Sequence, residues 1–142
     1  MSEAQASQIS PQRDDTATRA RAVLVLVAED EEPIAEIIAT VIQELDATPI
    51  VAAHGREALA LARQAAPALI ITDLMMPLMD GAELIATLRA EAAERGTQPP
   101  PVILMTASGR ENAARAGADV VLPKPFDLAA LEDLLRHYLA LP

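Results

Sequence analysis

Five short apolar runs, separated by stretches with helical periodicity, constrain the fold of this chain more than any other feature. They cover residues 23–28, 49–53, 68–72, 101–105 and 119–122. The first, third and fourth runs are the most continuously apolar, which is typical of strands buried on both faces of a parallel sheet. We therefore predict that these three runs form the central strands and that the other two form the edges.

The stretches between the runs carry apolar residues at helical spacing. Pro33 stands in the first turn of the first such stretch, where its missing N–H does no harm. Further helices are predicted over 55–66, 80–96 and 127–139, with a short fourth helix over 110–116. The first helix is predicted from the spacing of Ile34, Ile37, Ile38, Val41, Ile42 and Leu45.

The regular alternation of strand and helix predicts an α/β fold, with a five-stranded parallel sheet covered by helices on both faces. Central placement of the most apolar runs favours the flavodoxin-like, doubly wound (βα)5 order 2-1-3-4-5. At 142 residues the chain is too short for an eight-stranded barrel. Residues 1–21 are polar and show no sustained period, so we predict a disordered tail followed by one domain over 22–142.

Composition excludes several classes of function. The formal net charge of −10 argues against a nucleic-acid duplex or an anionic membrane as the main partner. The chain has no cysteine, which removes thiol chemistry and disulfides. No apolar run approaches the ~20 residues of a membrane span, and the N-terminus lacks a hydrophobic signal core. We therefore expect a small, soluble domain of the cytoplasm.

Polar side chains stand where four of the predicted strands end. Glu29 and Asp30 follow the first strand, Asp73 the third, Thr106 the fourth, and Lys124 comes just after the fifth. In an open parallel sheet, ligands bind outside the carboxyl ends of the strands, at the point where the strand order reverses. The sequence therefore predicts that these five side chains gather on one rim.

Three carboxylates on one rim repel one another unless a cation neutralises them. Oxygen ligands without His or Cys select a hard ion, and Mg²⁺ is the natural choice. An ion beside Asp73 would suit that carboxylate to accept a phosphoryl group, since phosphoryl transfer needs mainly alignment and charge neutralisation. Lys124 and the hydroxyl of Thr106 would stabilise the remaining phosphoryl oxygens.

Each residue also has a simpler interpretation when it is taken alone. Asp73 can be a turn residue or a helix cap, and Glu29 and Asp30 can be the acidic start of a helix. Thr106 can bond to the backbone, and Lys124 can be a solvated lysine. The common placement of all five at strand ends favours a site.

Other residues that could suggest different chemistry are interpreted structurally. Met75, Met76 and Met79 are expected to pack around a loop and not to bind a soft metal. His54 and His137 have no partner cluster in the sequence, so neither is proposed as a phosphodonor.

Four segments of the sequence resemble the receiver domain of two-component response regulators. They are 23–30, 72–81 (TDLMMPLMDG), 105–107 (MTA) and 123–126 (PKPF), and the likeness extends from about residue 23 to residue 139. Each segment alone is weak evidence, but here all four occur in order, each at the end of a predicted strand. The chain as a whole resembles a stand-alone, CheY-like receiver.

The resemblance implies a role for each residue of the rim. Asp73 resembles the phospho-acceptor. Glu29 and Asp30 resemble the acidic pair that holds Mg²⁺ with Asp73, helped by the main-chain carbonyl of Met75. Thr106 resembles the hydroxyl that moves toward the phosphoryl group. Lys124 resembles the lysine that pairs with a phosphoryl oxygen, and its peptide bond to Pro125 is expected to be cis.

Two departures from the family pattern concern the readout of phosphorylation. The family usually has an aromatic residue three positions before the lysine, and here that residue is Val121, which is too small and stiff to act as such a gate. Thr106 and Lys124 are 18 positions apart, roughly one helical turn fewer than usual, which implies a short fourth helix. Partner binding or homodimerisation is therefore expected to use another face, such as the first helix.

The functional hypothesis is a single-domain response regulator. It would accept a phosphoryl group on Asp73 from a sensor histidine kinase or a histidine phosphotransfer protein, and then bind a downstream protein. No segment for DNA binding or catalysis follows the last helix, so output is expected through protein contact. Two alternatives remain: a phosphorelay intermediate and a non-switching interaction domain. No enzymatic activity is expected beyond self-phosphorylation and self-dephosphorylation. A haloacid dehalogenase, which also uses a phospho-aspartate, would need a second Asp where Met75 stands.

Overall fold

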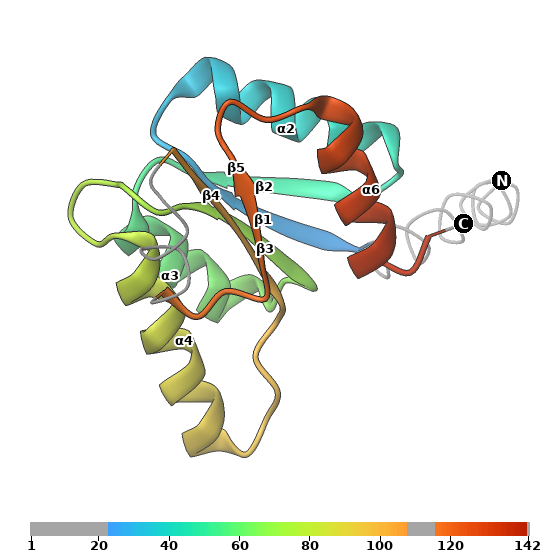
Figure 1. The fold of residues 1–142 in the computed structure, drawn as a ribbon. Helices are drawn as coiled ribbons and strands as arrows, with labels where there is room; N and C mark the ends of the chain where they lie inside the picture. Colours follow the sequence, from blue (N-terminus) through green and yellow to red (C-terminus); the bar gives the residue numbers. More distant parts are fainter. Residues whose placement is uncertain (1–22, 108–115, 142) are drawn as a thin grey trace, which may run out of the picture.

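The computed structural model describes residues 23–107 and 116–141, and these form one parallel sheet with helices on both sides (Figure 1). The strand order is β2-β1-β3-β4-β5, and every neighbouring pair is parallel. This confirms the predicted order. The strands are β1 (Leu24–Ala28), β2 (Thr48–Ala52), β3 (Leu69–Asp73), β4 (Val102–Thr106) and β5 (Val120–Pro123).

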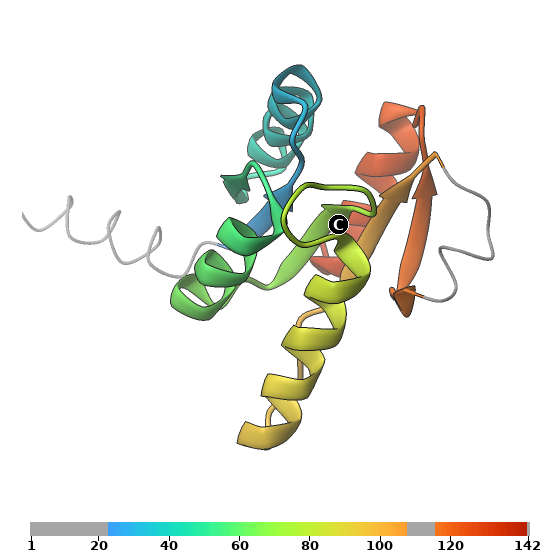
Figure 2. The ribbon, with the colours of Figure 1, turned by 90° about the vertical axis from the view of Figure 1, so that its left-hand side faces the viewer.

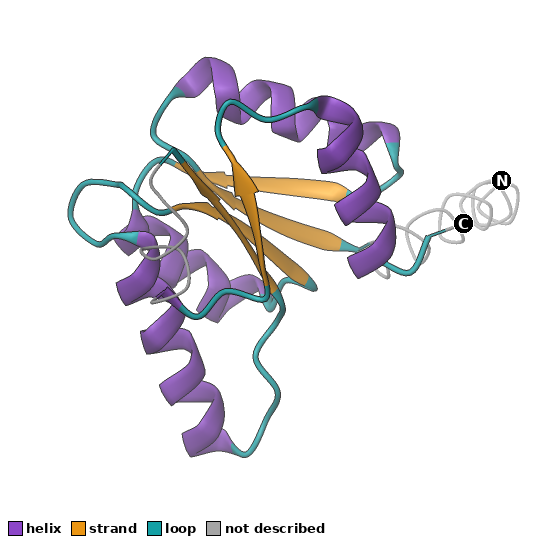
Figure 3. Ribbon diagram, viewed as in Figure 1, coloured by secondary structure: helices purple, strands orange, loops and turns teal. Residues whose placement is uncertain are grey.

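Four helices lie within the described part of the chain: α2 (Glu32–Glu44), α3 (Gly55–Ala65), α4 (Gly81–Arg95) and α6 (Leu128–Tyr138). Helices α2 and α6 cover one face of the sheet, and α3 and α4 cover the other (Figures 1 and 3). This is the doubly wound arrangement that the alternation predicted. Among the described residues, no helix is both long enough and apolar enough to cross a membrane.

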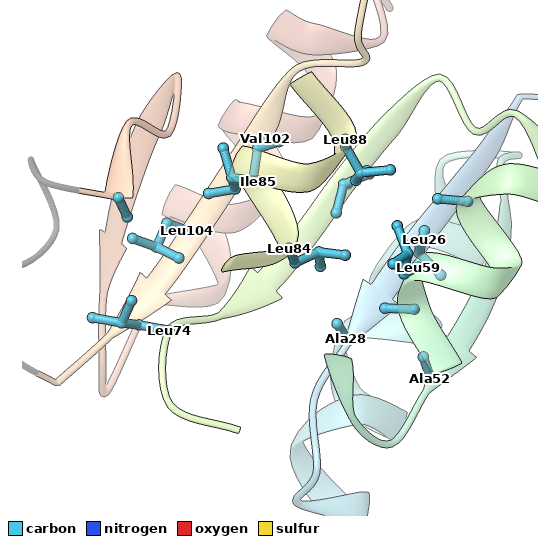
Figure 4. Close-up of a cluster of buried hydrophobic side chains, with 14 residues drawn as sticks. Leu26, Ala28, Ala52, Leu59, Leu74, Leu84, Ile85, Leu88, Val102 and Leu104 are labelled. Carbon is cyan, nitrogen blue, oxygen red and sulfur yellow. The ribbon is translucent and has the colours of Figure 1, made fainter. Parts of the chain in front are cut away.

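The central strands are apolar at nearly every position because both of their faces are covered. In β1, Val25 and Val27 pack toward α2 and α6, whereas Leu26 and Ala28 pack toward α3 and α4. Figure 4 shows the cluster of buried apolar residues under α3 and α4, in which Leu26 lies with residues from both of these helices. All five residues of β3 and of β4 are buried, whereas the edge strands β2 and β5 carry exposed or half-buried residues. The expected central and edge strands are therefore confirmed.

Helix ends follow local chemistry. Helix α4 begins with a capping box, in which Oδ1 of Asp80 accepts the N–H of Glu83 at 2.8 Å and Oε1 of Glu83 accepts the N–H of Asp80 at 3.2 Å. The helix ends at Gly96, whose φ of 68° suits glycine. Asp127 caps α6, as predicted, while His54 caps α3 by accepting the N–H of Glu57 at Nδ1.

Two expectations fall outside the described residues. The tail over 1–21 is one, so its disorder and the start of the domain at residue 22 stay predictions. The helix over 110–116 is the other: only Ala116 of that range is described, and it is helical. The expected shortening of the fourth helix is therefore not tested.

Candidate functional site

The edge at which the strands end brings the predicted rim together. Asp73 is the last residue of β3 and Thr106 the last residue of β4, while Lys124 comes directly after β5. Glu29 and Asp30 directly follow β1. Figure 2 faces this edge, and the loop between β3 and α4 lies at its front. The shared edge follows from parallel pairing, which aligns the carboxyl ends of all strands.

The three carboxylates lie close enough to bind one cation. One carboxylate oxygen from each of Glu29, Asp30 and Asp73 lies within 4.8 Å of the other two. Glu29 and Asp73 are 2% and 7% exposed, whereas Asp30 is exposed. Oxygen ligands with one open side fit a hard ion that keeps part of its water, so this donor set fits Mg²⁺. The carbonyl of Met75 stays a predicted additional ligand.

Lys124 compensates the two buried carboxylates. Its Nζ donates to Oε1 of Glu29 at 2.9 Å and to Oδ2 of Asp73 at 3.0 Å. The second oxygen of Glu29 accepts the backbone N–H of Glu31 at 3.0 Å. Because a buried carboxylate without a partner is costly, these contacts hold Glu29 and Asp73 at the sheet edge. The predicted proximity of the lysine is therefore present.

The protonation of this cluster follows from burial and hydrogen bonding. Burial raises the pKa of Glu29, and the hydrogen bonds from Lys124 and from the N–H of Glu31 only partly oppose that rise. Burial by itself would lower the pKa of Lys124, but the hydrogen bonds to Glu29 and Asp73 outweigh it, so that pKa is raised. Lys124 is therefore charged at neutral pH.

Thr106 connects the end of β4 to the lysine. Its side chain is buried, and its carbonyl accepts the backbone N–H of Lys124 at 2.9 Å. The peptide bond between Lys124 and Pro125 is cis, as the resemblance implied. Val121 is half-buried and packs against the cluster of apolar residues under α3 and α4.

The loop from Leu74 to Asp80 carries a tight turn. The N–H of Met79 donates to the carbonyl of Pro77 at 2.8 Å, around Leu78 with φ of 72°. This three-residue γ-turn with positive φ is a strained conformation for a leucine. Two backbone hydrogen bonds hold the base of the loop. The N–H of Leu74 donates to the carbonyl of Met105 at 2.9 Å, and the N–H of Gly81 donates to the carbonyl of Leu74 at 2.8 Å.

Two glycines allow backbone to approach backbone around this loop. A Cβ on Gly55 would lie 2.0 Å from the carbonyl oxygen of Met79, and one on Gly81 would lie 2.5 Å from the carbonyl oxygen of Asp73. No side chain fits at such distances. The loop that follows Asp73 is thus seated against the first residue of α3, a contact that sequence reasoning missed.

The expected packing of the loop methionines is only partly right. Met76 and Met79 pack against the α3 and α4 cluster, as expected, but Met75 is 68% exposed. The expectation was wrong for Met75 because its position, two residues after Asp73, is outside the sheet and beside the open side of the site.

A groove of about 740 Å³ opens beside Asp73 and Lys124. Its lining also includes Met75, Phe126 and Leu128, together with two residues of α2. Sequence reasoning missed the groove, since its walls come from several segments that are far apart in the sequence. The sequence signal for the groove was the apolar stripe of the first helix, to which the two α2 residues Ile34 and Ile37 belong. Ile34 is half-buried and Ile37 is 46% exposed.

The sequence matches the response regulator receiver domain family over residues 25–136. The chain belongs to this family. A similar curated protein is Response regulator Rre1 of Synechocystis, 33% identical over 126 residues that cover 85% of this chain and 53% of that protein. The receiver domain spans about half the length of this and several other curated relatives, some of which are named probable transcriptional regulators.

Solved receiver domains have the same fold. The receiver domain of Francisella response regulator 1452 has a TM-score of 0.72 and 33% identity, covering 82% of this chain and 95% of that one. The receiver domain of sensor histidine kinase PA1611 from Pseudomonas aeruginosa PAO1, described with a magnesium ion coordinated in its active site cleft, has a TM-score of 0.73 and 27% identity, covering 84% and 98%. These similarities agree with the predicted family.

Proposed function

We propose that this receiver domain accepts a phosphoryl group on Asp73, with Mg²⁺ bound by Glu29, Asp30 and Asp73, and that the modified form binds a protein partner in the cytoplasm. The observation that carries the proposal is the contact of two buried carboxylates and Lys124 beside the exposed Asp30. The magnesium ion described in the cleft of the Pseudomonas aeruginosa receiver domain supports the choice of metal.

The proposed step is a displacement at phosphorus. A carboxylate oxygen of Asp73 forms a bond to the phosphorus atom while the bond from phosphorus to a histidine nitrogen of the donor breaks. The electron pair of that bond leaves with the imidazole, and Asp73 becomes an acyl phosphate. Bound Mg²⁺ would neutralise charge on the transferred group. The chain modifies itself in this step and turns over no separate substrate.

Lys124 and Thr106 have distinct proposed roles. The ammonium of Lys124 already lies 3.0 Å from Oδ2 of Asp73, so it is placed to donate to an oxygen of a group attached there. The hydroxyl of Thr106, at the end of the neighbouring strand, would donate a hydrogen bond to a second oxygen of the phosphoryl group. At neutral pH the acyl phosphate carries about two negative charges in place of the one on the Asp73 carboxylate, and these donors must balance the increase.

The donor is proposed to be a phosphohistidine on a sensor kinase or a phosphotransfer protein. The groove beside Asp73 supports this, because its apolar wall includes the exposed Ile37 and Leu128. A docked protein would bury these side chains and bring its phosphohistidine to Asp73. A small free donor gains nothing from that apolar wall.

The test is incubation with acetyl phosphate and Mg²⁺, followed by intact mass measurement. The wild type should gain the mass of one phosphoryl group, and Asp73→Asn should gain none. An unmodified wild type, under conditions that label another receiver domain, would discard the proposal. Transfer of the label onward to a histidine phosphotransfer protein would identify a phosphorelay intermediate.

A second candidate function is a receiver-like interaction domain that does not switch. Val121 favours it, since a small β-branched side chain stands where the family usually has an aromatic residue. Comparison of amide hydrogen exchange with and without acetyl phosphate separates the candidates. A switching domain changes protection beyond the loops that touch Asp73, and a non-switching domain does not.

A further inference from the structure

Glu31 lies at the open side of the site and has no role in the proposed transfer. It is the N-cap residue of α2, but its side chain makes no capping hydrogen bond. That side chain is 64% exposed, and Glu31 lines the same groove as Asp73 and Lys124. A capping function therefore does not account for this carboxylate.

The charge of Glu31 is held near the reacting groups. Its Oε1 lies 4.0 Å from Nζ of Lys124, the same nitrogen that donates to Glu29 and Asp73. Its backbone N–H donates to Oε2 of Glu29 at 3.0 Å, which fixes the main chain of Glu31 relative to the site. Lys124 thus faces three carboxylates, of which only Glu31 is largely exposed.

We infer that Glu31 is a specificity-determining residue that slows transfer from small free phosphoryl donors. The inference rests on the proposed function. A free donor such as acetyl phosphate is an anion and must approach Asp73 past the exposed carboxylate of Glu31, which repels it. Glu31 also partly neutralises the charge of Lys124, the cation that would attract such a donor. A protein-borne donor overcomes the same repulsion with the free energy of docking.

An electrostatic role has a signature that a structural role lacks. A negative charge at this place repels an anionic donor but attracts Mg²⁺. Removing the charge of Glu31 should therefore speed phosphorylation and weaken Mg²⁺ binding at the same time. Disturbance of the local structure would impair both.

The experiment compares wild type, Glu31→Gln and Glu32→Gln. Glu32 is an exposed neighbour on the same helix, so its substitution changes the net charge equally. With acetyl phosphate at saturating Mg²⁺ and low salt, Glu31→Gln should raise the phosphorylation rate constant by about three- to tenfold. The gain should shrink in about 0.5 M NaCl, where the Debye length is only a few ångströms. Calorimetric titration with Mg²⁺ alone should show weaker binding by Glu31→Gln than by Glu32→Gln.

Separate outcomes overturn the inference and the proposed function. If the wild type is labelled and the phosphorylation rate constants of Glu31→Gln and Glu32→Gln are equal, the inference is overturned and the proposed function stands. A Glu31→Gln protein that is slower and also binds Mg²⁺ more weakly would overturn it as well, because that pattern indicates structural damage. Failure of acetyl phosphate to label the wild type, Glu31→Gln and Glu32→Gln alike would overturn the proposed function, and the inference with it.

Discussion

The ammonium nitrogen of Lys124 lies 3.0 Å from Oδ2 of Asp73, although the two residues are 51 positions apart. The strand registers produce this contact, since Asp73 pairs with Met105 and Thr106 pairs with Pro123. A slip of one residue in either pairing would move every side chain of the slipped strand to the opposite face. The contact is therefore a sensitive indicator of the native sheet.

Lys124→Met should lower the free energy of unfolding by about 2 kcal/mol at neutral pH without divalent ions, because Glu29 and Asp73 lose their buried cation. Mg²⁺ should recover most of that loss by neutralising the same carboxylates. Urea unfolding with and without Mg²⁺ measures both effects. Arg56→Met, at an exposed position of α3, is the control, and equal stability of the two variants would contradict the assignment.

Asp30→Asn should remove the stabilisation of the domain by Mg²⁺ while leaving its stability without the ion close to that of wild type. Asp30 is exposed and belongs to the carboxylate cluster, so its charge matters for the ion more than for the fold. In the wild type, Mg²⁺ at about a hundred times its dissociation constant should add about 2.7 kcal/mol. Thermal unfolding checks this, with Asp133→Asn on α6 as an exposed control that should keep the full response.

Leu78→Gly should raise the free energy of unfolding by about 1 kcal/mol. Leu78 has φ of 72° and is 65% exposed, so glycine relieves backbone strain without removing buried contacts. The extra entropy of glycine in the unfolded chain offsets part of the gain. Chemical denaturation gives the value. A loss of stability would mean that the Leu78 side chain contributes more than its exposure suggests.

Gly55→Ala should destabilise the domain by about 2 kcal/mol or more, since the new methyl group would meet the carbonyl of Met79. The contact is with backbone, so a side-chain rotation cannot relieve it. Gly96→Ala is the comparison: Gly96 has φ of 68° but open space around it, so only the backbone strain of about 1 kcal/mol applies. Urea unfolding that ranks Gly96→Ala as the more damaging change would contradict the seating of the loop on α3.

The ion pair between Arg63 of α3 and Glu91 of α4 should make stability depend on pH in the acid range. The hydrogen bond from Arg63 lowers the pKa of Glu91 below its usual 4.5. A carboxyl group with a lowered pKa stabilises the fold above the unfolded value and loses that contribution as the pH falls through the lowered pKa. A double-mutant cycle with Arg63→Gln and Glu91→Gln should show coupling at neutral pH that vanishes in acid. Coupling that persists unchanged in acid would exclude the Arg63–Glu91 ion pair as the source of the pH dependence.

The strands, the helices and the site residues could be predicted because each depends on local pattern plus one general rule. Continuous apolar runs such as that of β3 require cover on both faces, which implies a parallel sheet. Parallel strands then end at one edge, so Glu29, Asp73 and Lys124 are expected there together. The family resemblance added roles for these residues, and the geometry of the rim is consistent with them.

Other features could not be predicted, since they depend on distances between elements. The close approach of Gly55 to Met79 joins α3 to the loop after β3, and no local pattern reports it. Ile37 belongs to an apolar helical stripe, yet it is 46% exposed because α2 presents that side of the stripe to the groove. A stripe shows which residues share a face, not where the neighbouring element ends.

Periodicity and residue type by themselves determined the order of strands and helices and the set of side chains at the edge of the sheet, because both follow from burial of apolar faces and from the direction of the chain. The tertiary structure alone decided that one ammonium group serves two buried carboxylates and that Glu31 stands beside it. Those contacts depend on strand register and on the path of the loops, which fix the distances between atoms, whereas a sequence pattern places a side chain only on a face.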